Sequence, residues 1–136
     1  MTTKDEQNPN LNKFSNNGHA GLFELQMVNV VLTYELTTPA TRIVFPMRPT
    51  MTEEELADRQ RFYALSEDEI TAGRHKWNCQ LLEKLTDAAG VEGIELNGQS
   101  ISEFFSGPDP NGMKTKVVQD ALNRYNTMTQ PAEFFR

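Results

Sequence analysis

Cysteine is nearly absent from this 136-residue sequence, which contains only Cys79. A single cysteine cannot form an intrachain disulfide, so no disulfide framework is expected, and a reducing compartment is indicated. Long apolar runs are also missing, since no segment approaches the roughly 18 apolar residues of a membrane-spanning helix. The first ten residues lack the apolar stretch of a secretory signal. These absences predict a cytoplasmic protein that has no membrane partner.

Positive charge is scarce as well, with 13 lysines and arginines against 19 acidic residues and a net charge of −6. Nucleic-acid binding needs clustered basic residues that neutralise phosphates, so we expect no direct nucleic-acid ligand. The acidity is uneven, because residues 51–72 carry seven acidic residues and only two arginines. Such a window is either a solvated helix face or a surface that imitates the phosphates of a nucleic acid.

Motifs of catalysis and cofactor binding are absent too. The sequence contains no GxxxxGK[ST] or GxGxxG phosphate loop and no GxSxG nucleophile motif. His75 and Cys79 are four residues apart in a predicted helix, but a zinc site needs three or four ligands and no second pair accompanies them. We therefore predict no enzyme activity, no catalytic residue, no metal site and no cofactor.

The strongest helical pattern lies between Ser66 and Ala89. Ser66 and Glu69 have the spacing of a capping box, in which each side chain bonds a free backbone N–H at the helix start. Apolar residues then recur at helical spacing on one face: Ile70, Trp77, Leu81, Leu85 and Ala88. Gly90 follows as a C-cap. The pattern predicts a core-facing helix whose only tryptophan, Trp77, lies in the core.

A strand pattern precedes this helix. Apolar and polar residues alternate within residues 22–36, and the apolar face consists of Val28, Val30, Leu32 and Tyr34. Residues 41–45 are predicted to form the returning strand, which Pro46 and Pro49 would end. A two-stranded hairpin is marginally stable alone, so it must pack on helices or pair with a strand of another chain.

Further helices are predicted from their start signals. A second capping box at 52–55 opens a helix over residues 52–65, and a third at 100–103 opens a short helical turn. Asp109-Pro110 places an N-cap before a proline at the first helical position, and the pattern that follows runs to Met128.

The chain is predicted to have an α+β fold, with an N-terminal antiparallel β-hairpin packed on three to four helices. Asn97-Gly98 has the signature of a type I′ turn and predicts a small hairpin between residues 94–96 and 99–101. Residues 1–20 are polar and lack apolar periodicity, which indicates a disordered, mobile arm. We expect residues 21–136 to form a single domain.

Two pairs of adjacent phenylalanines and the acidic window are the candidate contact surfaces. Adjacent aromatic residues cannot both face inward on one helix, so one of each pair should face solvent or a partner. The terminal pair would be either a clasp on its own domain or a peptide that docks into another protein. The candidate partner-binding residues are Glu53, Glu54, Glu55, Asp58, Phe104, Phe105, Phe134 and Phe135.

The string VEGIELNGQSISEFF at 91–105, followed by a polar break, an amphipathic helix and a final Phe-Phe pair, resembles small proteins from the structural gene clusters of tailed phages. The order of β-hairpin, Arg-Pro-Thr at 48–50, acidic capped helix and second helix is similar as well. The nearest family is that of the tail assembly chaperones, and the resemblance covers residues 22–136. It implies binding to the tape-measure protein during tail building, and self-association.

These features predict a non-catalytic protein that acts in phage tail or particle assembly through contacts with a tail protein or with itself. The open edge of the hairpin and the exposed aromatic residues would make the contacts. A virion structural component is the first alternative, which the polar arm at 1–20 would suit. The second is an acidic, DNA-mimicking inhibitor of a host defence complex, similar to anti-CRISPR proteins. The expected location is the host cytoplasm or the virion.

Overall fold

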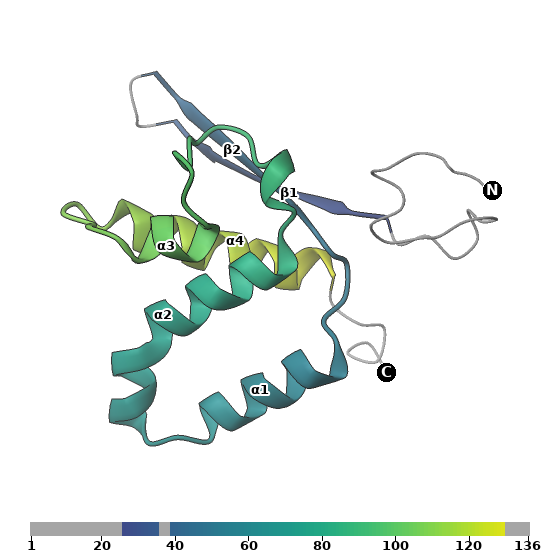
Figure 1. Cartoon of the computed structure of the whole chain (residues 1–136), viewed down its shortest axis with the longest axis vertical. Helices are drawn as coiled ribbons and strands as arrows, with labels where there is room; N and C mark the ends of the chain where they lie inside the picture. The colour runs from purple at the N-terminus through teal and green to yellow at the C-terminus, as the bar shows by residue number, and fades with distance from the viewer. Residues whose placement is uncertain (1–25, 36–38, 130–136) are drawn as a thin grey trace.

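A computed structural model describes residues 26–35 and 39–129 of the chain. Two antiparallel strands precede four α-helices and one short 3₁₀ helix in these ranges (Figure 1). The elements are β1 (Val28–Tyr34), β2 (Thr41–Met47), α1 (Glu53–Tyr63), α2 (Glu67–Leu85), η3 (Ala88–Gly90), α3 (Ile101–Ser106) and α4 (Met113–Met128). This architecture confirms the predicted α+β class. The arm predicted at 1–20 lies outside the described residues.

One face of the β1–β2 hairpin forms one side of the hydrophobic core. Val30 pairs with Phe45 and Leu32 with Ile43 in the strand register, and all four side chains are buried. The predicted inward face of β1 is therefore confirmed. α4 packs on β1, while α2 packs on both α3 and α4. The core thus lies between the hairpin and the three helices α2, α3 and α4 (Figure 1).

β2 continues through Pro46 to Met47, although the sequence predicts that Pro46 ends the strand. Val44 donates to the Glu92 carbonyl at 2.9 Å and accepts from the Glu92 N–H at 3.0 Å, so its backbone groups face away from β1. Alternate residues of a strand face the same side, and the Pro46 carbonyl likewise accepts from the Asp87 N–H at 2.9 Å. The missing N–H of Pro46 therefore removes no bond between β1 and β2.

α2 ends at Leu85, four residues before the predicted end at Ala89. Thr86 is extended, with φ −100° and ψ 138°, and forms a β-bridge with Met47. The Leu85 carbonyl accepts from the Arg48 N–H at 2.8 Å. These bonds to the end of β2 hold the backbone extended after Leu85, and α2 therefore ends there. Ala88 consequently lies exposed in η3 and not on the core-facing side of α2.

The predicted type I′ turn is confirmed, but the small hairpin around it is not. Asn97 and Gly98 both have positive φ, at 56° and 80°, and the Leu96 carbonyl accepts from the Gln99 N–H at 3.0 Å. The flanking residues 94–96 and 99–101 form no strand pair. The short segment after the turn leads directly into α3, which its own capping box starts at Ser100.

α4 begins at Met113, later than the Asp109-Pro110 signal predicts. Asp109 nevertheless caps the helix from outside, because its carboxylate accepts from the backbone N–H groups of Lys114 at 2.9 Å and Thr115 at 3.0 Å. These bonds lower the pKa of Asp109, with the Thr115 hydroxyl as the largest contributor.

No helix in the described ranges combines the length and the apolarity that crossing a membrane requires.

Candidate protein-interaction site

α1 is attached to the rest of the fold by few contacts and has no buried residue. It runs antiparallel to α2, away from the β-hairpin, with its start near the end of α2 (Figure 1). Its main apolar contact is the stack of Phe62 on Trp77, with ring centroids 5.2 Å apart and planes 11° apart, and Tyr63 meets Trp77 edge-on at 6.0 Å. Trp77 is only half-buried, which corrects its predicted place in the core. Trp77 packs against the core cluster from its edge, and the rings of α1 cover the rest of it only in part.

Arg48 fastens the N-terminal end of α1 to the body of the protein. Its Nη2 lies 2.6 Å from Glu55 Oε2 and donates to the Lys84 carbonyl at 3.1 Å, at the end of α2. The Arg48 and Glu55 side chains are 18% and 12% exposed, so solvent screens the pair only in part. Burial raises the pKa of Glu55, but the bonds from Arg48 and Thr52 outweigh it and hold the pKa below 4.5. The pair therefore depends on an ionised Glu55.

Glu55→Gln is expected to reduce the loss of stability on acidification. A carboxyl whose pKa is lowered in the folded state stabilises the fold fully above its unfolded pKa, and this contribution disappears as the pH falls through the folded value. The wild type should therefore lose this contribution below about pH 4.5, while the glutamine variant has none to lose. Urea denaturation at pH 7 and pH 3 measures the difference, with Glu95→Gln, in the exposed connector, as the control. Equal pH dependence in Glu55→Gln and wild type would contradict the assignment.

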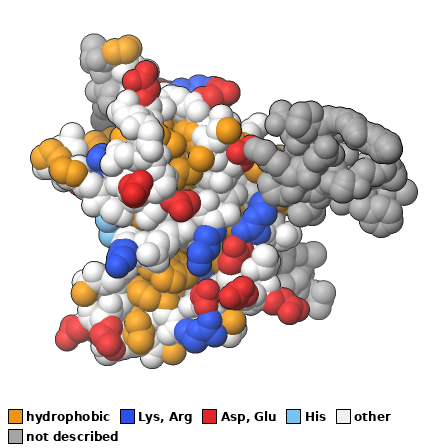
Figure 2. Space-filling model, in the orientation of Figure 1, with side chains coloured by type: hydrophobic (Ala, Val, Ile, Leu, Met, Phe, Trp, Pro, Cys, Tyr) orange, Lys and Arg blue, Asp and Glu red, His pale blue; other side chains and the backbone are white. Residues whose placement is uncertain are grey.

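Helix α1 and the turn that leads to α2 expose apolar side chains. Leu56, Tyr63 and Leu65 are 39%, 49% and 44% exposed, and Met128 is the other large hydrophobic residue exposed to this degree in the described ranges. Figure 2 shows hydrophobic side chains gathered over the lower part of the molecule, where α1 and α2 lie, with acidic and basic side chains around them. Apolar clusters with a polar border mark interaction surfaces more often than isolated exposed residues do.

A groove of about 250 Å³ lies between α1, α2 and α4, next to this surface. Its aromatic wall is formed by Tyr63 and Trp77, and its arginines are Arg59 and Arg74. Leu81 and Leu122 add aliphatic surface, and four amide side chains complete the lining: Asn78, Gln119, Asn123 and Asn126. No aspartate or glutamate is among the lining residues. The groove is therefore positively charged in a protein of net charge −6.

The acidic candidates are distributed unevenly around α1. Glu53 and Glu54 are exposed on its first turn, whereas Glu55 is the inward member that bonds Arg48. Asp58 is half-buried and forms ion pairs with Arg61 and, at 4.0 Å, with Lys84. The other acidic residues of the window lie on the first turn of α2, beyond the other end of α1, which an 11-residue helix places about 16 Å away. The window is thus two separate acidic clusters.

The phenylalanine pair of α3 divides as adjacent positions on a helix require. Phe105 is 1% exposed and packs against Phe45, with ring centroids 6.1 Å apart, so it belongs to the core and offers no surface to a partner. Phe104 is half-buried, meets Phe105 edge-on at 5.0 Å and has Lys114 Nζ 4.4 Å above its ring. The second pair, Phe134 and Phe135, lies outside the described residues.

His75 and Cys79 are close together but are not arranged as an activated nucleophile. Cys79 Sγ lies 3.5 Å from His75 Nε2, and the same nitrogen lies 2.9 Å from the Phe105 carbonyl. Cys79 is fully buried, and burial raises the pKa of its thiol. Among the described residues, no cluster of three or more His, Cys, Asp or Glu could hold a metal ion.

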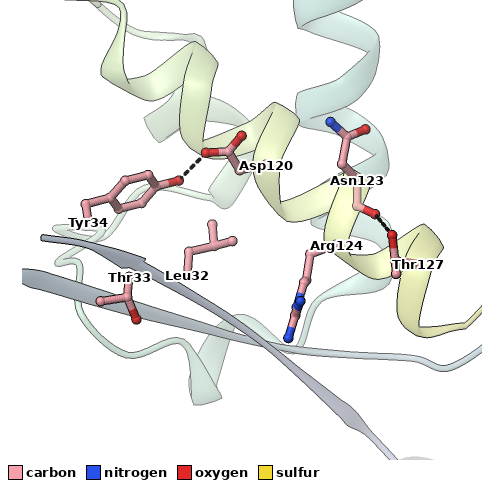
Figure 3. A pocket seen from close by; sticks show the side chains of 7 residues that line it. All are labelled: Leu32, Thr33, Tyr34, Asp120, Asn123, Arg124 and Thr127. Atoms are coloured by element: carbon pink, nitrogen blue, oxygen red, sulfur yellow. Dashed lines mark hydrogen bonds between the residues drawn. The ribbon is translucent and has the colours of Figure 1, made fainter.

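A second hollow, of about 270 Å³, lies between β1 and α4 and is open to solvent (Figure 3). The Tyr34 hydroxyl donates to Asp120 at 2.8 Å, and Lys116 lies 3.3 Å from the same carboxylate. Burial, followed by the bond to Asp120, raises the pKa of Tyr34 above its usual range. A tyrosine held neutral in this way cannot act as a base at neutral pH, and the arrangement holds α4 against β1.

The open edge predicted for the hairpin belongs to β1. The outer side of β2 bonds to the segment after α2, through Met47–Thr86 and Val44–Glu92 bridges. In the described part of the chain, the outer side of β1 forms no such bridge.

Sequence reasoning missed the groove, because its lining comes from three helices and no local pattern relates Arg59 to Arg74 or to α4. The helical spacing of Trp77 and Leu81 was the only signal of one wall. No protein-family model matches the chain, and neither the curated proteins nor the solved structures give a significant match.

Proposed function

We propose that this protein acts without catalysis, by binding another protein during the assembly of a tailed-phage particle, in the manner of a tail assembly chaperone. One observation carries the proposal. The α1–α2 hairpin presents Leu56, Tyr63 and Leu65 to solvent beside a groove, although burial of these side chains would stabilise the fold. Apolar side chains in such a position are typical of a surface that a partner covers.

The chemistry of the remaining sites supports the same proposal. Cys79 is buried beside His75, and Tyr34 is held neutral by its contacts, so neither has the activation that a nucleophile or base requires. Separation of the acidic window into two clusters weighs against the DNA-mimicking alternative, because imitation of a phosphate backbone needs closely spaced charges. The virion component remains the nearest alternative, since it would use the same surface permanently.

Affinity purification of the tagged full-length protein from its native cellular setting, followed by mass spectrometry, tests the proposal. We expect phage tail or capsid polypeptides among the recovered proteins. Leu65→Glu should lower their recovery about tenfold, because a carboxylate would have to be buried in the interface. Met128→Glu is the matched control, since Met128 is 43% exposed against 44% for Leu65 but lies at the end of α4. The Met128→Glu variant should recover the phage polypeptides at the wild-type level.

Three results would contradict the proposal. Recovery of a nuclease or DNA-binding complex would favour the inhibitor, and Glu53→Lys with Glu54→Lys should then abolish that recovery. Failure to recover any assembly protein would reject the assembly role. If the protein is present in purified particles, it is a virion component and not a chaperone.

A further inference from the structure

We propose that the groove between α1, α2 and α4 binds an acidic peptide segment of the partner, with carboxylates at Arg59 and Arg74 and an apolar side chain against Tyr63 and Trp77. This inference rests on the proposed function and names the chemistry of the partner. It also explains why the groove has arginines without ion pairs and an exposed aromatic surface, which the fold itself does not require.

Charge is the first argument. In the described ranges, neither Arg59 nor Arg74 forms an ion pair, and the only polar contact of the Arg59 guanidinium is with Met51 Sδ at 3.7 Å. By contrast, Arg48 and Arg61 are both paired with carboxylates. Two unpaired guanidinium groups in a groove without any acidic lining residue are complementary to carboxylates, which they can bind with two parallel hydrogen bonds.

The lining between the arginines is the second argument. Tyr63 is half exposed, and together with Trp77 it forms an aromatic surface that an apolar side chain can cover. On the opposite wall, Gln119, Asn123 and Asn126 carry amides, which both donate and accept hydrogen bonds and can therefore pair with a peptide backbone. Arginines, aromatic rings and amides together match a polypeptide that has acidic and apolar residues in alternation.

The size of the groove and its surroundings define the ligand further. A volume of about 250 Å³ is below the range of roughly 300–1,000 Å³ typical of small-molecule pockets, so a short part of a larger ligand fits better. A nucleic-acid strand would also stack on aromatic rings, but only two cations line the groove. Tight binding of a strand needs several cations that follow its phosphates. A peptide is therefore the favoured ligand.

A display library of random dodecapeptides, selected on the full-length chain, is the probe that tests this inference. We expect the selected peptides to be enriched in aspartate and glutamate beside a large apolar residue. Binding of a selected synthetic peptide should change the fluorescence of Trp77, which is the only tryptophan and lies in the groove wall. Its affinity should fall at least about tenfold in Arg59→Glu/Arg74→Glu, because both ion pairs become repulsive.

Arg61→Glu/Lys76→Glu is the matched control, since these residues lie on the same two helices but do not line the groove. It should bind the selected peptide as the wild type does, and circular dichroism should show that both double variants are folded. Failure to enrich acidic peptides, or equal affinity in the groove variant, would overturn the inference. Saturable binding of an oligothymidylate that the groove variant loses would identify a nucleic-acid site instead.

The purification experiment separates the two proposals. Recovery of assembly proteins by Arg59→Glu/Arg74→Glu at the wild-type level would reject the groove and leave the proposed function intact. Absence of assembly proteins from the wild-type sample, with acidic peptides still selected by the groove, would reject the assembly role alone.

Discussion

Gly93→Ala is expected to destabilise the protein by more than about 3 kcal/mol, because the new methyl group would collide with the backbone of β2. An ideal Cβ at Gly93 would lie 2.0 Å from the Arg42 carbonyl oxygen and 2.9 Å from Ile43 Cα. Gly93 also has a φ of +93°, which side-chain-bearing residues rarely adopt. Relief of the collision would require the segment to move away from β2 and break the two hydrogen bonds between Val44 and Glu92.

Chemical denaturation of Gly93→Ala and Gly98→Ala gives the loss of unfolding free energy in each variant. The difference between the two losses is the contribution of the collision. Gly98 has a φ of +80° but no atom within 4 Å of its ideal Cβ. It should therefore cost only the roughly 1–2 kcal/mol of a left-handed backbone conformation. Equal losses of unfolding free energy in the two variants would contradict the close contact between Gly93 and the Arg42 carbonyl.

Phe105→Ala is expected to cost about 3–5 kcal/mol, the usual loss for a buried phenylalanine. The side chain is 1% exposed and contacts the ring of Phe45, which is itself fully buried in β2. Its removal would leave a cavity between α3 and the sheet. A loss of this size is a large part of the 5–15 kcal/mol that stabilises a typical domain.

Phe104→Ala is the control for this variant, because the two residues are adjacent and identical in type. Phe104 is half-buried, with Lys114 over its ring, so we expect its removal to cost about 1 kcal/mol. Urea denaturation midpoints of both variants give the comparison. A larger loss for Phe104→Ala would reverse the assignment of the inward and outward members of the pair.

The features that sequence predicted well depend on residues close together in the chain. All three capping boxes, at 52–55, 66–69 and 100–103, are present with both hydrogen bonds. Each requires only two side chains three positions apart and a free helix start. The type I′ turn at 97–98 is equally local. The inward face of β1 followed from the period of two that every strand imposes.

The features that sequence could not give depend on distant partners. α2 ends early because residues 86–92 bond to β2, about 40 positions earlier in the chain. Helical spacing placed Trp77 on an apolar face, but spacing does not tell how much of that face is covered. α1 covers it only partly, and the uncovered remainder becomes a wall of the groove.

The sparse attachment of α1 also has a consequence for the dynamics of the chain. A helix without buried residues, held by ring contacts with Trp77 and two ion pairs, can detach at a lower free energy than complete unfolding requires. Its amide protons should then exchange with solvent through this partial opening, while those of α4 exchange through rarer events. A ligand held between Arg59 of α1 and Gln119 of α4 would suppress the opening, because it connects the least stable helix to one of the most deeply packed.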